Sequence, residues 1–191
     1  MSVVDSTIGY LGYGTVSFGG LSWKDICETP VVATAQNVVI TGNHRGIHAR
    51  GAILNFDNIV VTGGNEESIR VDSCSGHVSS CTATPPSEMW GIVARRSPGI
   101  MITDNTIMGD KGMWLSLTDG LQVTGNTFTP SSKAVRVRTS NTVYVGNVGD
   151  GVYPGSDGDI GLRAQTDGCF TDTSFAAETA VNLHIVDNMC T

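Results

Sequence analysis

The sequence predicts an all-β solenoid, in which short strands stack coil upon coil to form a single domain. The first observation is a seven-residue pattern that has mostly apolar residues at its second and fourth places and ends in Asn or Gly. Its copies start 21 or 41 residues apart, at residues 37, 58, 99, 120, 141 and 182. A repeat of about this length is typical of solenoids, because each unit buries its apolar side only against neighbouring units.

The second observation is a series of short stretches in which apolar and polar residues alternate. They are GIHAR at 46–50, SIRVD at 68–72, GIVAR at 91–95 and GMWLS at 112–116. Alternation with period two indicates β-strands, so each unit holds two strands separated by polar turns. The repeat count predicts about seven or eight coils in one domain over residues 1–191, with insertions near 73–90 and 164–181.

The seventh place of the repeated pattern predicts a stacked row of asparagines at a corner of the coil. An Asn side chain tolerates turn conformations, and stacked copies hydrogen-bond one another. The row consists of Asn43, Gly64, Asn105, Asn126, Asn147 and Asn188. Residues at the second and fourth places are expected to face inward, where they form the core.

The repeats VVITGN and LQVTGN, with their asparagine row, resemble those of the pectate-lyase-like superfamily of right-handed parallel β-helices. The resemblance covers nearly the whole chain and implies a single-stack right-handed parallel β-helix with an asparagine ladder. Most proteins of this kind bind or process polysaccharides, and others are virion spikes or adhesins. The resemblance alone assigns no function, because one fold hosts many activities.

Composition excludes two classes of partner. Only 15% of the residues are charged and the net charge is −7, whereas binding of nucleic acid requires a basic surface. No apolar run is long enough to span a membrane. Neither end of the chain carries a capping helix, so we expect a longer protein or an assembly with partners at both ends.

The cysteines suggest a location. Cys74 and Cys81 bracket a short polar stretch that a disulfide could close, Cys169 and Cys190 could pair near the C-terminus, and Cys27 is left over. Two such bridges favour an oxidising compartment, and we expect an extracellular, cell-surface or virion-surface location. The alternative is five reduced thiols, mostly buried as small apolar groups.

The second strand of each unit is expected to present a charged surface. In GIHAR the Ile and Ala point inward, so His48 and Arg50 point outward. Stacking then predicts two outward rows, which are Ser22, His48, Arg70, Val93 and Trp114, and Lys24, Arg50, Asp72, Arg95 and Ser116.

Two interpretations of these rows remain open. In one, Asp72 lies between Arg50 and Arg95 in a solvated ion-pair network that contributes little to stability. In the other, the basic stripe binds an acidic glycan, because Arg grips carboxylates through two hydrogen bonds. The contacts would then be Lys24, Arg50, Arg70, Asp72, Arg95 and Trp114.

Two functions follow from these interpretations. The first is a non-catalytic module of a secreted, cell-surface or virion assembly, with a structural or adhesive role or binding of acidic glycan along the stripe. The second is a polysaccharide-active enzyme of the uronan lyase or C5-epimerase type, with His48 as base and Arg50 or Arg95 as carboxylate neutraliser. The familiar catalytic motifs DPH, WIDH and NTD are missing, so we favour the first.

Two further sites are weaker. No cofactor is expected, although Asp150, Asp157 and Asp159 could bind calcium through hard oxygen ligands. The third place of the repeated pattern predicts an outward apolar face that another subunit or domain would cover. Its residues are Val39, Val60, Met101 and Val143.

Overall fold

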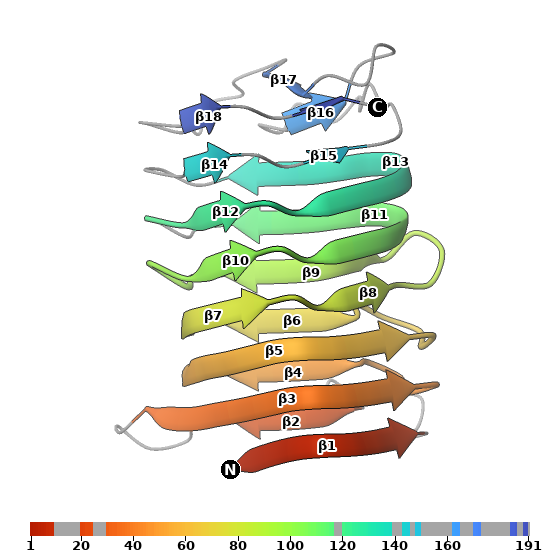
Figure 1. The fold of residues 1–191 in the computed structure, drawn as a ribbon, viewed down its shortest axis with the longest axis vertical. Coiled ribbons are helices and arrows are strands. Elements are labelled where there is room, and N and C mark those ends of the chain that lie inside the picture. The colour runs from red at the N-terminus through yellow and green to blue at the C-terminus, as the bar shows by residue number, and fades with distance from the viewer. Residues whose placement is uncertain are drawn as a thin grey trace.

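The structure is a computed structural model that describes residues 1–9, 20–24, 30–116 and 120–138, and short strands beyond them. Side chains are described up to residue 129. The described residues form strands and turns without a helix, and the strands stack into a parallel β-solenoid (Figure 1). The predicted fold class is thereby confirmed.

The front of the stack in Figure 1 is a parallel ladder of the first strands of each coil. In order, the levels are β1 (Ser2–Gly9), β3 (Val31–Thr41), β5 (Ala52–Thr62), β7 (Ser75–Ser79) with β8 (Thr82–Thr84), β10 (Met101–Thr103) with the start of β11 (Thr106–Ser116), β12 (Gln122–Thr124) with the start of β13 (Thr127–Arg138), β14 (Val143–Val145) with β15 (Val148–Gly149), and β18 (His184–Val186) with β19 (Met189–Cys190).

The back of the stack is a second parallel ladder formed by the returning strands. Its members are β2 (Leu21–Lys24), β4 (Ile47–Arg50), β6 (Ile69–Asp72), β9 (Trp90–Arg95) and the later parts of β11 and β13. The short strands β16 (Leu162–Ala164) and β17 (Phe170–Asp172) pair with each other in antiparallel fashion. The back ladder is described only as far as β13. The number of coils that have both faces described is therefore smaller than the predicted seven or eight.

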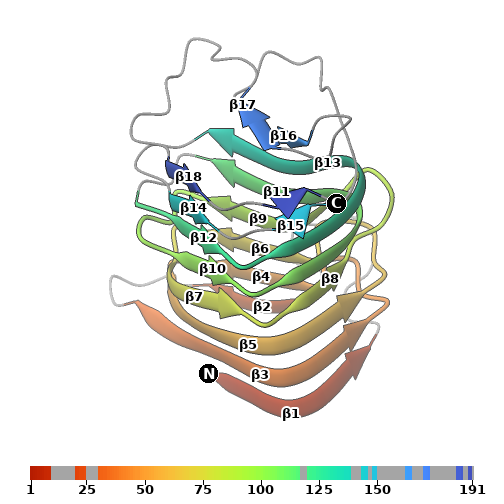
Figure 2. The same ribbon diagram turned by 45° about the horizontal axis from the view of Figure 1, so that its top comes forward.

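Each front strand turns sharply at one residue and so forms two legs (Figure 2). The turning residues have left-handed backbone angles in register with one another, and they are Asp5, Asn37, Asn58, Ser80, Asp104 and Gly125. Asn and Asp tolerate this conformation better than most residues. Their side chains also bond along the corner, since Asn58 Nδ2 donates to Asn37 Oδ1 at 2.9 Å and Asn37 Nδ2 donates to Asp5 Oδ1 at 2.8 Å.

The core follows the predicted alternation. The second and fourth places of the repeated pattern are completely buried wherever side chains are described, at Val38, Ile40, Ile59, Val61, Ile100, Ile102, Leu121 and Val123. Alternate residues of the back strands, such as Ile47 and Ala49, are buried from the opposite side. The interior is therefore filled by apolar side chains from both ladders.

The predicted apolar face is wrong, because the copies of the pattern do not all stack on one another. The pattern begins at the turning residue in 37–43 and 58–64, whereas in 99–105 and 120–126 the turning residue is at its sixth place. Val60 pairs with Thr82, and Met101 pairs with His77. Val39 and Val60 therefore belong to one row, and Met101 and Val143 to another. That these rows contact a partner chain stays a prediction.

The reason for the mismatch lies in residues 73–90. They are not an insertion, because β7 and β8 are hydrogen-bonded between β5 and the next coil. This coil carries no copy of the seven-residue pattern, so only the doubled spacing of 41 residues between 58 and 99 indicates it in the sequence. The second predicted insertion, 164–181, lies mostly outside the described residues, apart from Ala164 and β17.

The asparagine ladder is confirmed in part. Asn105 and Asn126 are buried on successive coils, and Asn105 Nδ2 donates to Asn126 Oδ1 at 2.9 Å. Before them the same position holds Cys81, whose backbone N–H donates to Asn105 Oδ1. Asn43 and Gly64 occupy a different corner, which follows the front strand. Asn147 and Asn188 lie outside the described residues.

A charged candidate site on the back sheet

The two outward rows of the back sheet are present in the predicted register. In each row, every residue pairs with the equivalent residue of the next coil. The first row runs through Ser22, His48, Arg70, Val93 and Trp114, and the second through Lys24, Arg50, Asp72, Arg95 and Ser116. All seven predicted site residues thus lie on one face, side by side along the coils. Their contacts, however, divide them into two groups with different roles.

His48 points out of the coil but is only 8% exposed. Its Nε2 lies 3.0 Å from Asp72 Oδ2, and its Nδ1 lies 3.4 Å from a terminal guanidinium nitrogen of Arg45. Arginine can only donate hydrogen bonds, so Nδ1 must accept and the ring proton must sit on Nε2. Both ring nitrogens are therefore engaged, which leaves neither free to remove a proton from a substrate.

Asp72 is the centre of this group. Its Oδ2 accepts a hydrogen bond from Arg70 Nε at 2.8 Å as well as the bond from His48. Burial alone would raise the pKa of Asp72, but the hydrogen bonds from His48 and Arg70 outweigh it and hold the pKa at about 2. Asp72 therefore pairs with Arg70 and His48, and not with Arg50 and Arg95 as the ion-pair interpretation assumed.

Three residues that sequence analysis missed complete the group. Arg45, at the corner before β4, forms ion pairs with Glu66 and Glu67, which occupy the same corner one coil later. Glu67 also lies 3.4 Å from Arg70. The available signal was the succession of NHRG at 43–46 and NEES at 65–68, which places opposite charges at equivalent positions of neighbouring units. We call Arg45, His48, Glu66, Glu67, Arg70 and Asp72 the ion-pair cluster.

Arg70 belongs to this cluster and not to a free basic surface. Burial would lower the pKa of Arg70, but the hydrogen bond and charge of Asp72, together with Glu67, raise it. Its guanidinium is thus held by two carboxylates. An acidic ligand at Arg70 would be repelled by the charges of these two carboxylates.

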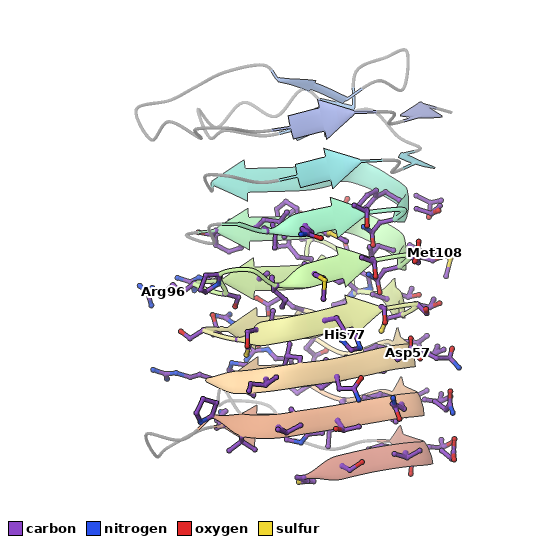
Figure 3. All side chains as sticks on the ribbon, turned by 60° about the vertical axis from the view of Figure 1, so that its left-hand side comes forward. Asp57, His77, Arg96 and Met108 are labelled. Atoms are coloured by element: carbon purple, nitrogen blue, oxygen red, sulfur yellow. The ribbon has the colours of Figure 1, made fainter. Side chains whose placement is uncertain are left out.

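The second group is a line of cations at the C-terminal ends of the back strands. It consists of Lys24, Arg50, Arg95 and the following corner residue Arg96, and we call it the cationic edge. Arg50 and Arg96 are exposed, and Arg96 projects away from the stack (Figure 3). Within the described residues, no carboxylate forms an ion pair with Arg50, Arg95 or Arg96.

The positive charges of this edge act on one another. Burial, followed by the charges of Arg45 and Arg50, lowers the pKa of Lys24. The guanidinium of Arg95 lies over the ring of Trp114, 5.7 Å from its centroid, and Trp90 lies 6.3 Å from Trp114. The edge therefore combines like charges with an adjacent aromatic surface.

Comparison with known protein families identifies a match. A family model described as periplasmic copper-binding protein (NosD) matches residues 11–153. The chain belongs to the NosD family. No curated protein and no solved structure matches it. In addition, the described part of this NosD-family chain holds no helix long and apolar enough to cross a membrane.

The described His, Cys, Asp and Glu residues form no site for the copper ion that the family description implies. Copper prefers thiolate, thioether or imidazole ligands. In residues 1–129, as far as they are described, no three His, Cys, Asp or Glu side chains converge on one point. His48 has both ring nitrogens engaged, and Cys74 and Cys81 are buried. Asp150, Asp157 and Asp159, predicted to bind calcium, lie outside the described residues, so that prediction stays open.

The predicted disulfide between Cys74 and Cys81 is not formed, and both residues are free thiols. The stretch between them is strand β7 and not a loop, so an extended segment holds them at opposite ends. Each Cys directly follows a left-handed residue, Ser73 or Ser80, and points inward at a corner. The side chains of Cys27, Cys169 and Cys190 lie outside the description, so the second predicted bridge is untested.

We expect both described thiols to resist alkylation in the folded protein. Burial raises the pKa of Cys74 to about 11 and that of Cys81 to about 12, and the thiolate is the reactive form. Iodoacetamide at pH 8 should leave both peptides unlabelled by mass spectrometry, and should label them after unfolding in urea. Native labelling at the rate seen in urea would contradict the burial of these residues.

Asp72 should make stability depend on pH in the acid range. Its pKa is lowered from 3.8 to about 2 on folding, so its contribution is present above pH 3.8 and is lost as the pH falls towards 2. Thermal unfolding of the wild type should therefore shift to lower temperature over this range more steeply than that of Asp72→Asn, which has no carboxylate to protonate. Parallel curves for the two proteins would show that Asp72 is not held as described.

Proposed function

We propose that the chain is a non-catalytic extracytoplasmic β-helix module that binds an acidic polysaccharide along the cationic edge. One observation carries the proposal. Asp72, the only acidic residue in the predicted rows, is engaged by Arg70 and His48, which leaves the charges of Arg50, Arg95 and Arg96 without a carboxylate partner in the described residues. The family description as periplasmic supports an extracytoplasmic location.

The chemistry of the edge favours a glycan over other polyanions. The chain as a whole carries a net charge of −7, so a nucleic acid would meet repulsion over most of the surface. Arginine binds a carboxylate through two parallel hydrogen bonds, and Trp114 offers a flat apolar face beside Arg95. The cations follow one another along the coil axis, so a linear chain would contact them in succession.

A polysaccharide lyase or epimerase is the second candidate. The hydrogen bond between His48 and Asp72 favours it, because a carboxylate often orients a catalytic imidazole. Against it stands the contact of Arg45 with Nδ1 of His48, which occupies the nitrogen that a base would use. Turnover would require Arg45 to leave Glu66 and Glu67 as well as His48.

The test is a binding and turnover series with pectate, alginate and hyaluronan. Arg50→Ala and Arg95→Ala should each weaken binding, by up to about tenfold in Kd, which corresponds to about 1.4 kcal/mol. Lys111→Ala, which removes a cation at the other end of the back face, is the matched control. Affinity should fall as salt rises, since exposed charges are screened over about 10 Å at 0.1 M ionic strength.

Two outcomes would overturn this proposal. Absence of binding to every acidic glycan in the series would exclude the module function. Formation of unsaturated product, or proton exchange at C5, that is lost in His48→Ala would establish the enzyme instead. A binding module should show neither reaction and should retain glycan affinity in His48→Ala.

A further inference from the structure

The row that contains the cationic edge has an alternating charge pattern. From the second coil onward its residues are Arg50, Asp72, Arg95, Ser116 and Arg138, each paired in register with the next. Cations therefore occupy every second coil, and the coils between them carry an anion or a neutral residue. Lys24, on the first coil, lies outside this alternation.

The spacing of these cations is fixed by the fold. Neighbouring strands of a sheet lie about 4.8 Å apart, so cations two coils apart are separated by about 9.6 Å along the axis at the backbone. One sugar of an extended polysaccharide is close in length to one such strand spacing. A chain that runs along the axis would thus place alternate sugars beside Arg50 and Arg95.

The position between the two arginines is unfavourable for a second carboxylate. Asp72 is ionised at neutral pH, as an ordinary aspartate is, and hydrogen bonds from His48 and Arg70 lower its pKa further. Its Oδ2 is held by these bonds, and the side chain is still 19% exposed. A ligand carboxylate at this level would face a fixed negative charge, whereas a neutral sugar would face an acceptor for its hydroxyl groups.

We infer that the ligand is a polysaccharide with an acidic group on every second sugar, and that Asp72 selects it over a chain in which every sugar is acidic. This inference rests on the proposed function, since it specifies the glycan that the cationic edge binds. Arg50 and Arg95 hold alternate carboxylates, and Asp72 faces the neutral sugar between them. Selectivity then comes from a repulsive element as much as from attraction.

The experiment compares hyaluronan oligosaccharides, which alternate acidic and neutral sugars, with oligogalacturonates of equal length. Titration calorimetry at one fixed ionic strength should give tighter binding to hyaluronan, by about tenfold, although it carries half the charge. Asp72→Asn, which keeps an acceptor for Arg70 and His48, should reduce this ratio towards one or reverse it. Arg95→Gln should weaken hyaluronan binding more than the matched variant Arg96→Gln, which lies outside the alternating row.

The outcomes separate this inference from the proposed function. Binding to neither oligosaccharide would overturn both. Binding that follows total charge, with oligogalacturonate tighter in the wild type, would overturn the inference and leave the glycan module standing. Circular dichroism of Asp72→Asn checks its fold, and if that variant is unfolded the wild-type ratio and the comparison of Arg95→Gln with Arg96→Gln decide the question.

Discussion

Replacing Gly46 by alanine is expected to destabilise the protein by about 3 kcal/mol, which corresponds to roughly 10 °C in the midpoint of thermal unfolding. Gly46 precedes β4, at the corner where each coil enters the back sheet. A Cβ added there would lie closer than 3.0 Å to the backbone oxygen of Ser68 and to a methyl group of Val61. Neither can move away, because one is backbone of the next coil and the other is packed in the core.

The reason for this restriction is that a small residue is needed at the same place in each coil. Gly20, Ser68 and Gly91 occupy the corresponding positions on other coils, and a Cβ at Gly91 would meet Ile107 in the same manner. Gly9→Ala is the matched control, since a Cβ there would make only ordinary contacts with Thr41. Equal unfolding midpoints for Gly46→Ala and the wild type would contradict the close packing of this corner.

Much of the fold could be predicted because its determinants are periodic. Alternation places Ile47 and Ala49 inside and Arg50 outside whatever the neighbouring coils contain, and stacking then aligns Arg50 with Asp72 and Arg95. The register of the back sheet was correct for this reason. A coil without the repeated pattern was enough to defeat the same reasoning on the front face, where Val60 stacks on Thr82 instead of Met101.

The pairing within the candidate site could not be predicted from stacking. Register places Asp72 between Arg50 and Arg95, but its carboxylate turns to Arg70 in its own strand and to His48 in the preceding coil. That choice depends on Arg45 and Glu67, which come from corner loops whose conformation the repeat does not specify. The division between an ion-pair cluster and a cationic edge is therefore visible only in three dimensions.

The two cysteines illustrate a related difficulty. Their spacing in the sequence suits a disulfide across a loop, yet each takes the inward position at a corner that Ser97 or Asn105 takes one coil later. There the Sγ–H groups of Cys74 and Cys81 donate to the backbone oxygens of Asp72 and Ser79. A buried corner residue and a disulfide partner look the same in one sequence, because a cysteine beside a turn suits both roles.

Asn126→Leu is expected to destabilise the protein by about 3 kcal/mol, since at least two buried polar groups would lose their partners at about 1–3 kcal/mol each. The backbone N–H and the Nδ2 of Asn105 both donate to Asn126 Oδ1, at 3.0 and 2.9 Å. In return Asn126 Nδ2 donates to Ile102 O at 2.9 Å. A leucine fits the volume but satisfies none of these groups, so the cost comes from desolvated polar atoms and not from packing.

The matched control for this variant is Asn58→Gly on the exposed corner. Asn58 also bonds to an asparagine of the neighbouring coil, Asn37, but it is open to water, and glycine accepts its left-handed backbone. Urea unfolding followed by circular dichroism should show a large loss for Asn126→Leu and a small change for Asn58→Gly. Equal losses of unfolding free energy in the two variants would contradict this explanation. They would show that the hydrogen bonds between asparagines stabilise the protein to the same extent whether or not the asparagines are buried.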